Sequence, residues 1–318
     1  MLAREWVSDE RSREEPRLGG IESAMTPSGL VIVDKPAGVT SHDVVARMRR
    51  IAGTRRVGHA GTLDPMATGV LVIGVEKATR LLGHLVLADK AYSATIRLGQ
   101  STLTDDAEGS VTGGSSAAAV TERDVRAAVE SLTGQIAQVP SSVSAIKVGG
   151  ERAYKRARTG EAVELAARPV TVARFEVDGF RRPAPELLDV DAEIECSSGT
   201  YVRALARDLG AALGVGGHLT TLRRTRVGPF TLSVARTLDE LANLDDPVTL
   251  PLAEAVRAAM PVREVSDDEA RSLSFGKALE PAGIAGTYAA LAPDGSAVAL
   301  LREVDGSARP VLVFAAAG

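Results

Sequence analysis

The segment from Leu188 to Cys196 alternates without exception between apolar and acidic residues. Its apolar residues and Cys196 share one face of an extended chain, and its four acidic residues share the other. This period of two predicts a strand in a sheet with one buried and one wet face, which is typical of antiparallel pairing. Strands and helices elsewhere alternate without repeated βαβ units. We therefore predict an α+β fold with a mixed, largely antiparallel sheet flanked by helices.

The remaining elements of the first 258 residues follow from local patterns. Short apolar runs and alternation predict strands, and apolar residues at helical spacing behind a capping residue predict helices. Gly, Ser and Ala from Gly109 to Ala119 predict a loop. The predicted strands are Gly29–Asp34, Val70–Val75 and Tyr92–Leu98; the predicted helices run from Ser41, as N-cap, to about Ile51, from Thr121 with a capping box at Asp124, and over 202–213.

The two ends of the chain differ from this central part. After about Ala258 the sequence predicts a helix over 267–274 and short strands near 286–290, 297–303 and 311–315. We expect a small, separate β-rich C-terminal domain at 259–318, after a larger domain at 25–258. Residues 1–24 interleave Arg and Glu, so we expect this segment to be disordered, or Met25 to be the true start.

Composition indicates a water-soluble protein of the cytoplasm. The chain has 318 residues, 45% of them hydrophobic, and a mean hydropathy of +0.05. No apolar run approaches the roughly 18 residues that a membrane span needs. The lone Cys196 excludes an intrachain disulfide and fits a reducing compartment.

Charge is segregated along the chain, although the net charge is only −4. Residues 146–158 and 203–226 each carry five bases and one acid, whereas 236–269 carries nine acids and three bases. A basic segment by itself is as well explained as a solvated face. Two such segments in an acidic protein favour a polyanionic partner modestly, because a phosphate backbone responds to the local patch.

The segment Val57–Leu71, V-G-H-A-G-T-L-D-P-M-A-T-G-V-L, is the best candidate for chemistry. Its glycines and proline predict that Gly58–Thr68 is neither helix nor strand, and His59 and Asp64 are its ionisable residues. The four histidines lack paired metal-ligand spacing, and neither a phosphate-binding glycine loop nor a nucleophile elbow occurs. We therefore expect side-chain chemistry without a metal or cofactor.

This segment resembles the active-site motif of the TruB family of tRNA pseudouridine synthases. The resemblance covers about residues 29–230, with further motifs in the family's order. These motifs are Asp34–Gly38 with Thr40–Ser41, Lys90–Tyr92, Ser198–Arg203 and Thr221–Thr225. It implies the pseudouridine synthase fold, no cofactor, a PUA-like RNA-binding C-terminal domain and a monomer that needs no protein partner.

The resemblance also implies roles for individual residues. Asp64 matches the catalytic aspartate, Tyr92 the base-stacking tyrosine and Arg203 the partner of Asp64. Residues implied in substrate binding are His59 near the flipped bases, Leu222 in the uracil pocket, Lys35, Gly61, Thr62, and Lys147 in a thumb-like RNA-binding insertion at about 140–168.

Each catalytic assignment has a structural alternative. Asp64 precedes Pro65, and Asp-Pro is common in turns; Tyr92 lies on the apolar face of its strand and could be a core residue. Arg203 lies in the first turn of its helix, where the dipole disfavours a cation by roughly 0.3–1 kcal/mol. An anion should therefore lie nearby: Asp64, Asp208 or the acidic face of the preceding strand. A buried carboxylate needs such a cation to stay ionised.

The resemblance implies isomerisation of uridine to pseudouridine at position 55, in the TΨC loop of tRNA. Three alternatives remain: an RNA-guided enzyme of the dyskerin type, a non-catalytic tRNA-binding module, and a glycosidase-like hydrolase that releases free uracil.

Overall fold

The computed structural model describes residues 27–141, 147–148, 151–152 and 165–314. Its larger sheet has ten strands, in the order β14-β1-β3-β12-β4-β11-β10-β7, with β2 paired to β3 and β13 paired to β12. Of these pairs only β3 with β12 is parallel, which confirms the largely antiparallel sheet. The strands are β1 (Gly29–Lys35), β2 (Val57–Ala60), β3 (Thr68–Val75), β4 (Lys90–Leu98), β7 (Gly134–Gln138), β10 (Arg168–Ala184), β11 (Leu187–Cys196), β12 (Gly217–Val227), β13 (Phe230–Thr231) and β14 (Leu250–Pro251).

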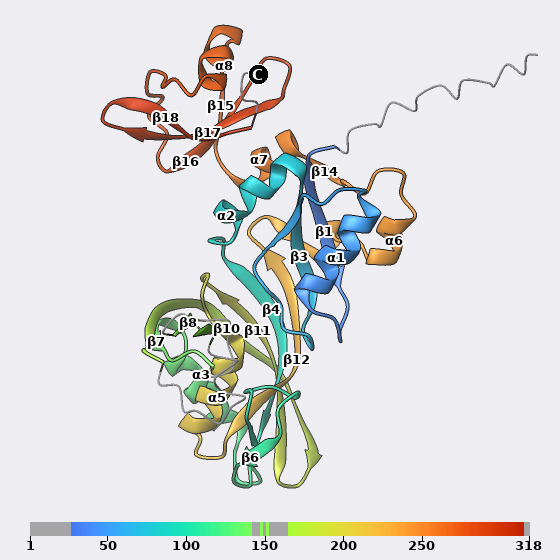
Figure 1. Ribbon diagram of the computed structural model, residues 1–318. Helices are drawn as coiled ribbons and strands as arrows, with labels where there is room; N and C mark the ends of the chain where they lie inside the picture. Colours follow the sequence, from blue (N-terminus) through green and yellow to red (C-terminus); the bar gives the residue numbers. More distant parts are fainter. Residues whose placement is uncertain (1–26, 142–146, 149–150, 153–164, 315–318) are drawn as a thin grey trace, which may run out of the picture.

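Helices cover this sheet at both ends of its strand order (Figure 1). The helices α3 and α5 pack against β10 and β12, whereas α1 packs against β2 and α6 against α1. The helices are α1 (Ser41–Ile51), η1 (Glu76–Leu81), α2 (Leu82–Leu85), α3 (Glu122–Ser131), α5 (Val202–Ala212), η2 (Leu232–Val234), α6 (Leu238–Ala242) and α7 (Leu252–Ala259). Two small hairpins pair β5 (Ser101–Thr102) with β6 (Val111–Gly113) and β8 (Lys147–Val148) with β9 (Glu151–Arg152).

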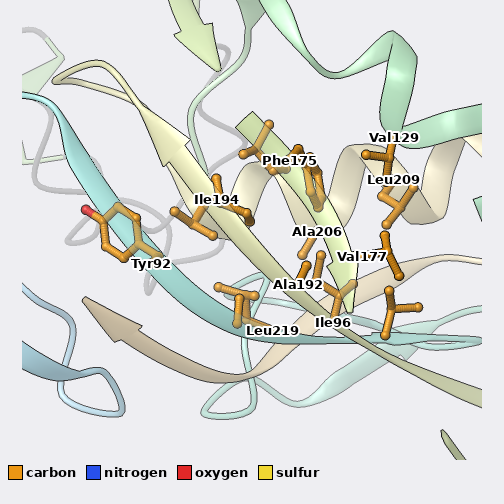
Figure 2. Close-up of a cluster of buried hydrophobic side chains, with 14 of the residues drawn as sticks. Tyr92, Ile96, Val129, Phe175, Val177, Ala192, Ile194, Ala206, Leu209 and Leu219 are labelled. Atoms are coloured by element: carbon orange, nitrogen blue, oxygen red, sulfur yellow. The ribbon is translucent and has the colours of Figure 1, made fainter. Parts of the chain in front are cut away.

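The predicted alternating strand is β11, and one of its faces lies in the core. Leu188, Val190, Ala192 and Ile194 belong to a cluster with residues of β4, β12, α3 and α5 (Figure 2). The acidic face pairs with neighbouring strands: Asp189, which is buried, binds Arg97 of β4 at 2.7 Å. The face predicted to be wet is therefore partly closed by ion pairs across the sheet.

The C-terminal residues form a second, four-stranded sheet at one end of the molecule (Figure 1). Its elements are β15 (Val262–Glu264), α8 (Asp267–Ser274), β16 (Thr287–Leu291), β17 (Ala297–Val304) and β18 (Ser307–Val313). The small β-rich domain and its helix are thus confirmed. The domain is less separate than expected, because Leu291, Leu300 and Phe314 share one hydrophobic cluster with Leu30 and Val72 of β1 and β3.

Four local predictions were wrong in detail. Gly58 and His59 lie within β2, and Thr68 begins β3, so Gly58–Thr68 is irregular only in its middle. Backbone pairing with β3 extends through these residues despite the glycine. The N-cap of α1 is Thr40 rather than Ser41. A short strand, β6, interrupts the loop predicted at 109–119, and β18 begins at residue 307 rather than 311.

In the described residues no helix is both long and apolar enough to cross a membrane.

Candidate active site

The loop between β2 and β3 carries Asp64 and is held by hydrogen bonds to its backbone. The buried Ser41 at the start of α1 accepts a hydrogen bond from the Leu63 amide at 2.9 Å and donates one to the Leu63 carbonyl at 3.1 Å. This use of its hydroxyl explains why Thr40 takes the N-cap. The Gly38 amide donates to the Pro65 carbonyl at 2.8 Å. The chain on both sides of Asp64 is therefore fixed to α1 and to the turn that precedes this helix.

Two buried cations hold the same loop through its carbonyl groups. Lys35 Nζ donates to the carbonyls of Pro65 and Ala67, at 3.2 and 2.7 Å, and to that of Pro36. Burial lowers the pKa of Lys35, and the nearby Asp64 charge opposes this shift. Because its three donors reach backbone oxygens, Lys35 supports the loop in this structure.

The second buried cation, Arg224 of β12, binds the other end of the loop. Its guanidinium donates to the carbonyls of Gly61 at 3.0 Å and Val70 at 2.7 Å. Its own backbone lies against Gly69, where an added Cβ would be 2.2 Å from the Arg224 carbonyl oxygen, and Gly69 has a φ of +98°. Only glycine fits there. Arg224 lies in the Thr221–Thr225 motif, but the resemblance implied no role for this arginine.

Asp64 and Arg203 form the ion pair that the sequence pointed to. Arg203 Nε lies 3.0 Å from Asp64 Oδ2, and Nη2 donates to Oδ1 at 3.4 Å. The Arg203 side chain is 7% exposed and the Asp64 side chain 37% exposed. The carboxylate is therefore open to a substrate on one side while a buried guanidinium neutralises it on the other. The alternative partner, Asp208, pairs with Arg207 instead.

A second carboxylate, Asp106, completes this arrangement and was missed from the sequence. Asp106 is 2% exposed, and its Oδ2 lies 3.3 Å from Arg203 Nη1, which also donates to the Thr104 carbonyl at 2.7 Å. Asp106 itself accepts from the Thr104 hydroxyl and the Glu108 amide. The guanidinium of Arg203 is thus oriented from both sides. Nothing in the sequence near Asp106 indicates this pairing, because Arg203 follows nearly 100 residues later.

Burial dominates the electrostatics of Asp64. Desolvation raises its pKa above the ordinary aspartate value, and Arg203 is the main influence that lowers it again; Asp106 also raises it, while Lys35 and Arg224 lower it. The net direction is upward. Ionised Asp64 is therefore less favoured here than an aspartate in water, and the cations around it limit that shift.

Tyr92 lies at the boundary between the core and this site. The ring is 7% exposed and belongs to the hydrophobic cluster with Leu63 and Leu222. Figure 2 shows its phenol oxygen directed away from the labelled aliphatic side chains. Burial raises its pKa, and Arg224, opposite Tyr92 across the β4–β12 pair, lowers it. A ring that is apolar with a polar end is compatible with a core residue and with a residue that stacks on a base.

The other predicted site residues lie at different depths around the loop. His59 of β2 is half-buried, contacts His42 edge-on with ring centroids 5.6 Å apart, and has a pKa that burial lowers. Thr62 is exposed, and Gly61 has a φ of +83°. Lys147 begins β8, but its side chain and most of the predicted insertion at 140–168 lie outside the described residues.

The described residues hold no group of three or more metal-ligating His, Cys, Asp or Glu side chains. The arrangement consists of a partly exposed carboxylate, a buried guanidinium and an aromatic ring. It can stabilise or transfer charge at a substrate placed against Asp64.

Three family models match consecutive parts of the chain. They are described as the N-terminal domain of the TruB family pseudouridylate synthases, over 49–202, the C-terminal domain of tRNA pseudouridylate synthase B, over 203–257, and the C-terminal region of tRNA pseudouridine synthase II, over 260–315. Together they span most of the chain, including Asp64, Tyr92 and Arg203.

This chain belongs to the TruB family.

Named relatives agree with this assignment to the TruB family of pseudouridine synthases, which are isomerases. The chain is 64% identical to the tRNA pseudouridine synthase B of Arthrobacter sp. (strain FB24) over 298 residues, which are 91% of this chain and 97% of that protein. It is 63% identical to the protein of the same name from Thermobifida fusca (strain YX), over 90% of this chain and 98% of that one.

Solved structures confirm the predicted fold. A chain from a crystal structure of a Cbf5-Nop10-Gar1 complex matches with a TM-score of 0.71 and 26% identity, over 99% of this chain and 95% of that one. A chain from an H/ACA RNP bound to a substrate RNA containing 2'-deoxyuridine matches with a TM-score of 0.68 and 25% identity, over 90% and 84%.

Proposed function

We propose that this chain converts uridine to pseudouridine at position 55 of the TΨC loop of tRNA. The observation that carries the proposal is the Asp64–Arg203 pair, with its carboxylate open on one side, in a chain more than 60% identical to proteins named tRNA pseudouridine synthase B. The target base is stacked inside folded RNA and must be flipped out, at a cost of roughly a few kcal/mol.

The residues of the site divide the work of the isomerisation. The flipped uracil lies against Tyr92 and Leu222, and Asp64 assists cleavage of the glycosidic bond. The freed uracil rotates, and a carbon–carbon bond to the ribose forms. Three routes are open to Asp64: attack on the ribose, attack on the base, or removal of a ribose proton. Arg203 keeps Asp64 ionised on every route, because burial by itself favours the protonated acid.

The rest of the chain serves RNA binding. His59, Gly61 and Thr62 meet the RNA around the flipped base, and Lys35 acts through the loop that it supports. Lys147, the thumb-like insertion at 140–168 and the PUA-like domain at 259–318 grip the remaining RNA, beside a catalytic domain at 25–258. The enzyme acts in the cytoplasm as a monomer without a cofactor or an obligatory protein partner.

One experiment tests this function directly. The purified chain is incubated with an unmodified tRNA transcript, and pseudouridine is mapped chemically. We expect modification at position 55, and we expect the Asp64→Asn variant to lose at least about 1,000-fold in rate because its amide cannot serve as base or nucleophile, while tRNA binding is kept.

The same assay tests the role of Asp64 and separates the alternatives, because tRNA binding without any turnover indicates a non-catalytic module. Appreciable turnover by Asp64→Asn contradicts the role of Asp64. Release of free uracil indicates a hydrolase. A chain that is inactive alone but active with partner proteins and a guide RNA is of the RNA-guided type; the similar solved structures include chains from an H/ACA RNP and from a Cbf5-Nop10-Gar1 complex.

A further inference from the structure

The most basic part of the described chain lies outside the two segments that the sequence analysis identified. Residues 44–63 contain five arginines and no acidic residue, a local charge of +5. These arginines are Arg47, Arg49, Arg50, Arg55 and Arg56. The segment covers most of α1 and all of β2, and it leads directly into the loop that carries Asp64.

Four of these guanidiniums face water. Arg49, Arg50, Arg55 and Arg56 are exposed, and we call them the arginine patch. Within the described part of the chain, the ion pair in the patch joins Arg56 to Glu76 at 3.5 Å, with the arginine 78% exposed. Exposed pairs of this kind contribute little to stability. Arg47 is different, because it pairs with Asp239 of α6.

Helix stability accounts for only two of the four patch arginines. Arg49 and Arg50 lie in the last turn of α1, where cations interact favourably with the helix dipole. Arg55 and Arg56 follow the helix end at Ala52, so the dipole gives no reason for them. Arg49 Nη2 donates to the Val57 carbonyl at 3.4 Å, which holds the end of α1 against the start of β2. The four positive charges of the patch thus lie within eight residues of sequence, 49–56.

We propose that the arginine patch binds the phosphate backbone of the RNA substrate, outside the nucleotides that enter the active site. Guanidinium groups match phosphate oxygens in geometry and charge. The four residues of β2 lie between the patch and the Asp64 loop. At roughly 3.3 Å per residue, this strand is about 13 Å long. A stem that presents its loop to Asp64 therefore has phosphates near the patch. This inference rests on the proposed function for the identity of the RNA.

The test measures tRNA binding by the full chain at several salt concentrations. An Asp64→Asn background prevents turnover, and the four patch arginines are changed to Gln. Each lost phosphate contact should reduce the slope of log K against log salt by about 0.7–0.9. We expect the fourfold variant to lose about three units of slope and at least about tenfold in affinity near 0.1 M salt. Arg123→Gln changes an exposed arginine of α3 and is the control, which should leave both values unchanged.

The outcomes are separable. An unchanged slope and Kd in the fourfold variant, or an equal loss with Arg123→Gln, overturns the proposal. The fourfold variant could melt at a lower temperature than its parent. In that case the double variant Arg55→Gln/Arg56→Gln, whose changes lie outside the helix, must show about half the change in slope. An unchanged slope in the double variant also overturns the proposal. If wild-type chain forms no pseudouridine yet shows arginine-dependent RNA binding, the proposed function fails while the RNA surface stands.

Discussion

Asp64 lies in an environment that opposes its own ionisation. Burial raises its pKa, and Arg203 opposes the rise more than any other group does. Arg203 in turn is held by Asp106 and the Thr104 carbonyl. The protonation state of the Asp64 carboxylate thus depends on buried groups that lie behind it.

The pH dependence of the reaction should report this balance. If the reactive form is the carboxylate, activity is lost as pH falls through the raised pKa of Asp64, so the acidic limb lies above the ordinary aspartate value of 3.8. Arg203→Gln removes the main influence that lowers the pKa, so the limb of its residual activity should move to higher pH. Single-turnover rates from pH 4 to 8 measure the acidic limb of the wild-type protein and that of Arg203→Gln.

Arg207→Gln is the control for that shift. Arg207 pairs with Asp105 and Asp208 rather than with Asp64, so its substitution should not move the limb. A limb at the same pH in wild type and in Arg203→Gln would contradict the role given to the ion pair.

Sequence motifs predicted Asp64, Tyr92 and Arg203, but they did not predict the residues that support them. Asp64, Tyr92 and Arg203 lie in motifs that can be read without a structure, and the arginine's place in the first turn of a helix already required a nearby anion. Asp106 and Arg224 act through contacts with residues nearly 100 or more positions away. No local pattern encodes such pairs, so they emerge only when the fold brings these distant segments together.

At the scale of elements, the contact between β3 and β12 joins the two halves of the large sheet. This contact is the parallel pair of the sheet, with a short register around Thr68 and Gly69. Arg224 crosses it to reach the carbonyls of the Asp64 loop. The loop is therefore shaped by a strand that follows it by more than 150 residues.

Gly69→Ala should destabilise the protein by at least about 2 kcal/mol. Its φ is +98°, and a Cβ would meet the Arg224 carbonyl oxygen at 2.2 Å, so strain and overlap combine. Gly214 also has a positive φ, +70°, but no atom within 4 Å of an added Cβ. Gly214→Ala should therefore cost only the 1–2 kcal/mol or so of the left-handed conformation. Urea unfolding measures both, and equal losses would contradict the overlap.

The elements that sequence reasoning predicted well are those with a strong period. The alternation in β11 gave its bounds to within one residue, and the capping box of Thr121 and Asp124 gave the start of α3. The β2 strand was missed because its glycine suggested a break, whereas pairing with β3 maintains it. Tertiary pairing overrides local propensity at such positions.

At the scale of the molecule, the two sheets share apolar contacts. Leu291 of β16 belongs to the cluster that also contains Leu30 and Val72, whereas Leu301 of β17 belongs to the cluster of the C-terminal domain itself. Both side chains are fully buried. The C-terminal sheet therefore has one face in its own core and another in a common core.

This arrangement predicts cooperative unfolding. Leu291→Ala and Leu301→Ala should each cost about 2–5 kcal/mol, and each variant should still melt in one calorimetric transition, because the shared cluster couples the sheets. Two transitions in Leu301→Ala, with the upper one at the wild-type temperature, would show that the domains unfold independently.

The common core also limits how the tail of such a chain can be exchanged. A C-terminal sheet grafted from a distant homologue would bring its own side chains against Leu30, Ile32 and Val72. Those three positions come long before residue 259 in the chain. A chimera with its junction near residue 259 therefore keeps them unchanged, and they no longer match the grafted side of the shared cluster. Successful hybrids will need compensating changes in β1, whose Lys35 supports the Asp64 loop, and in β3, which follows that loop.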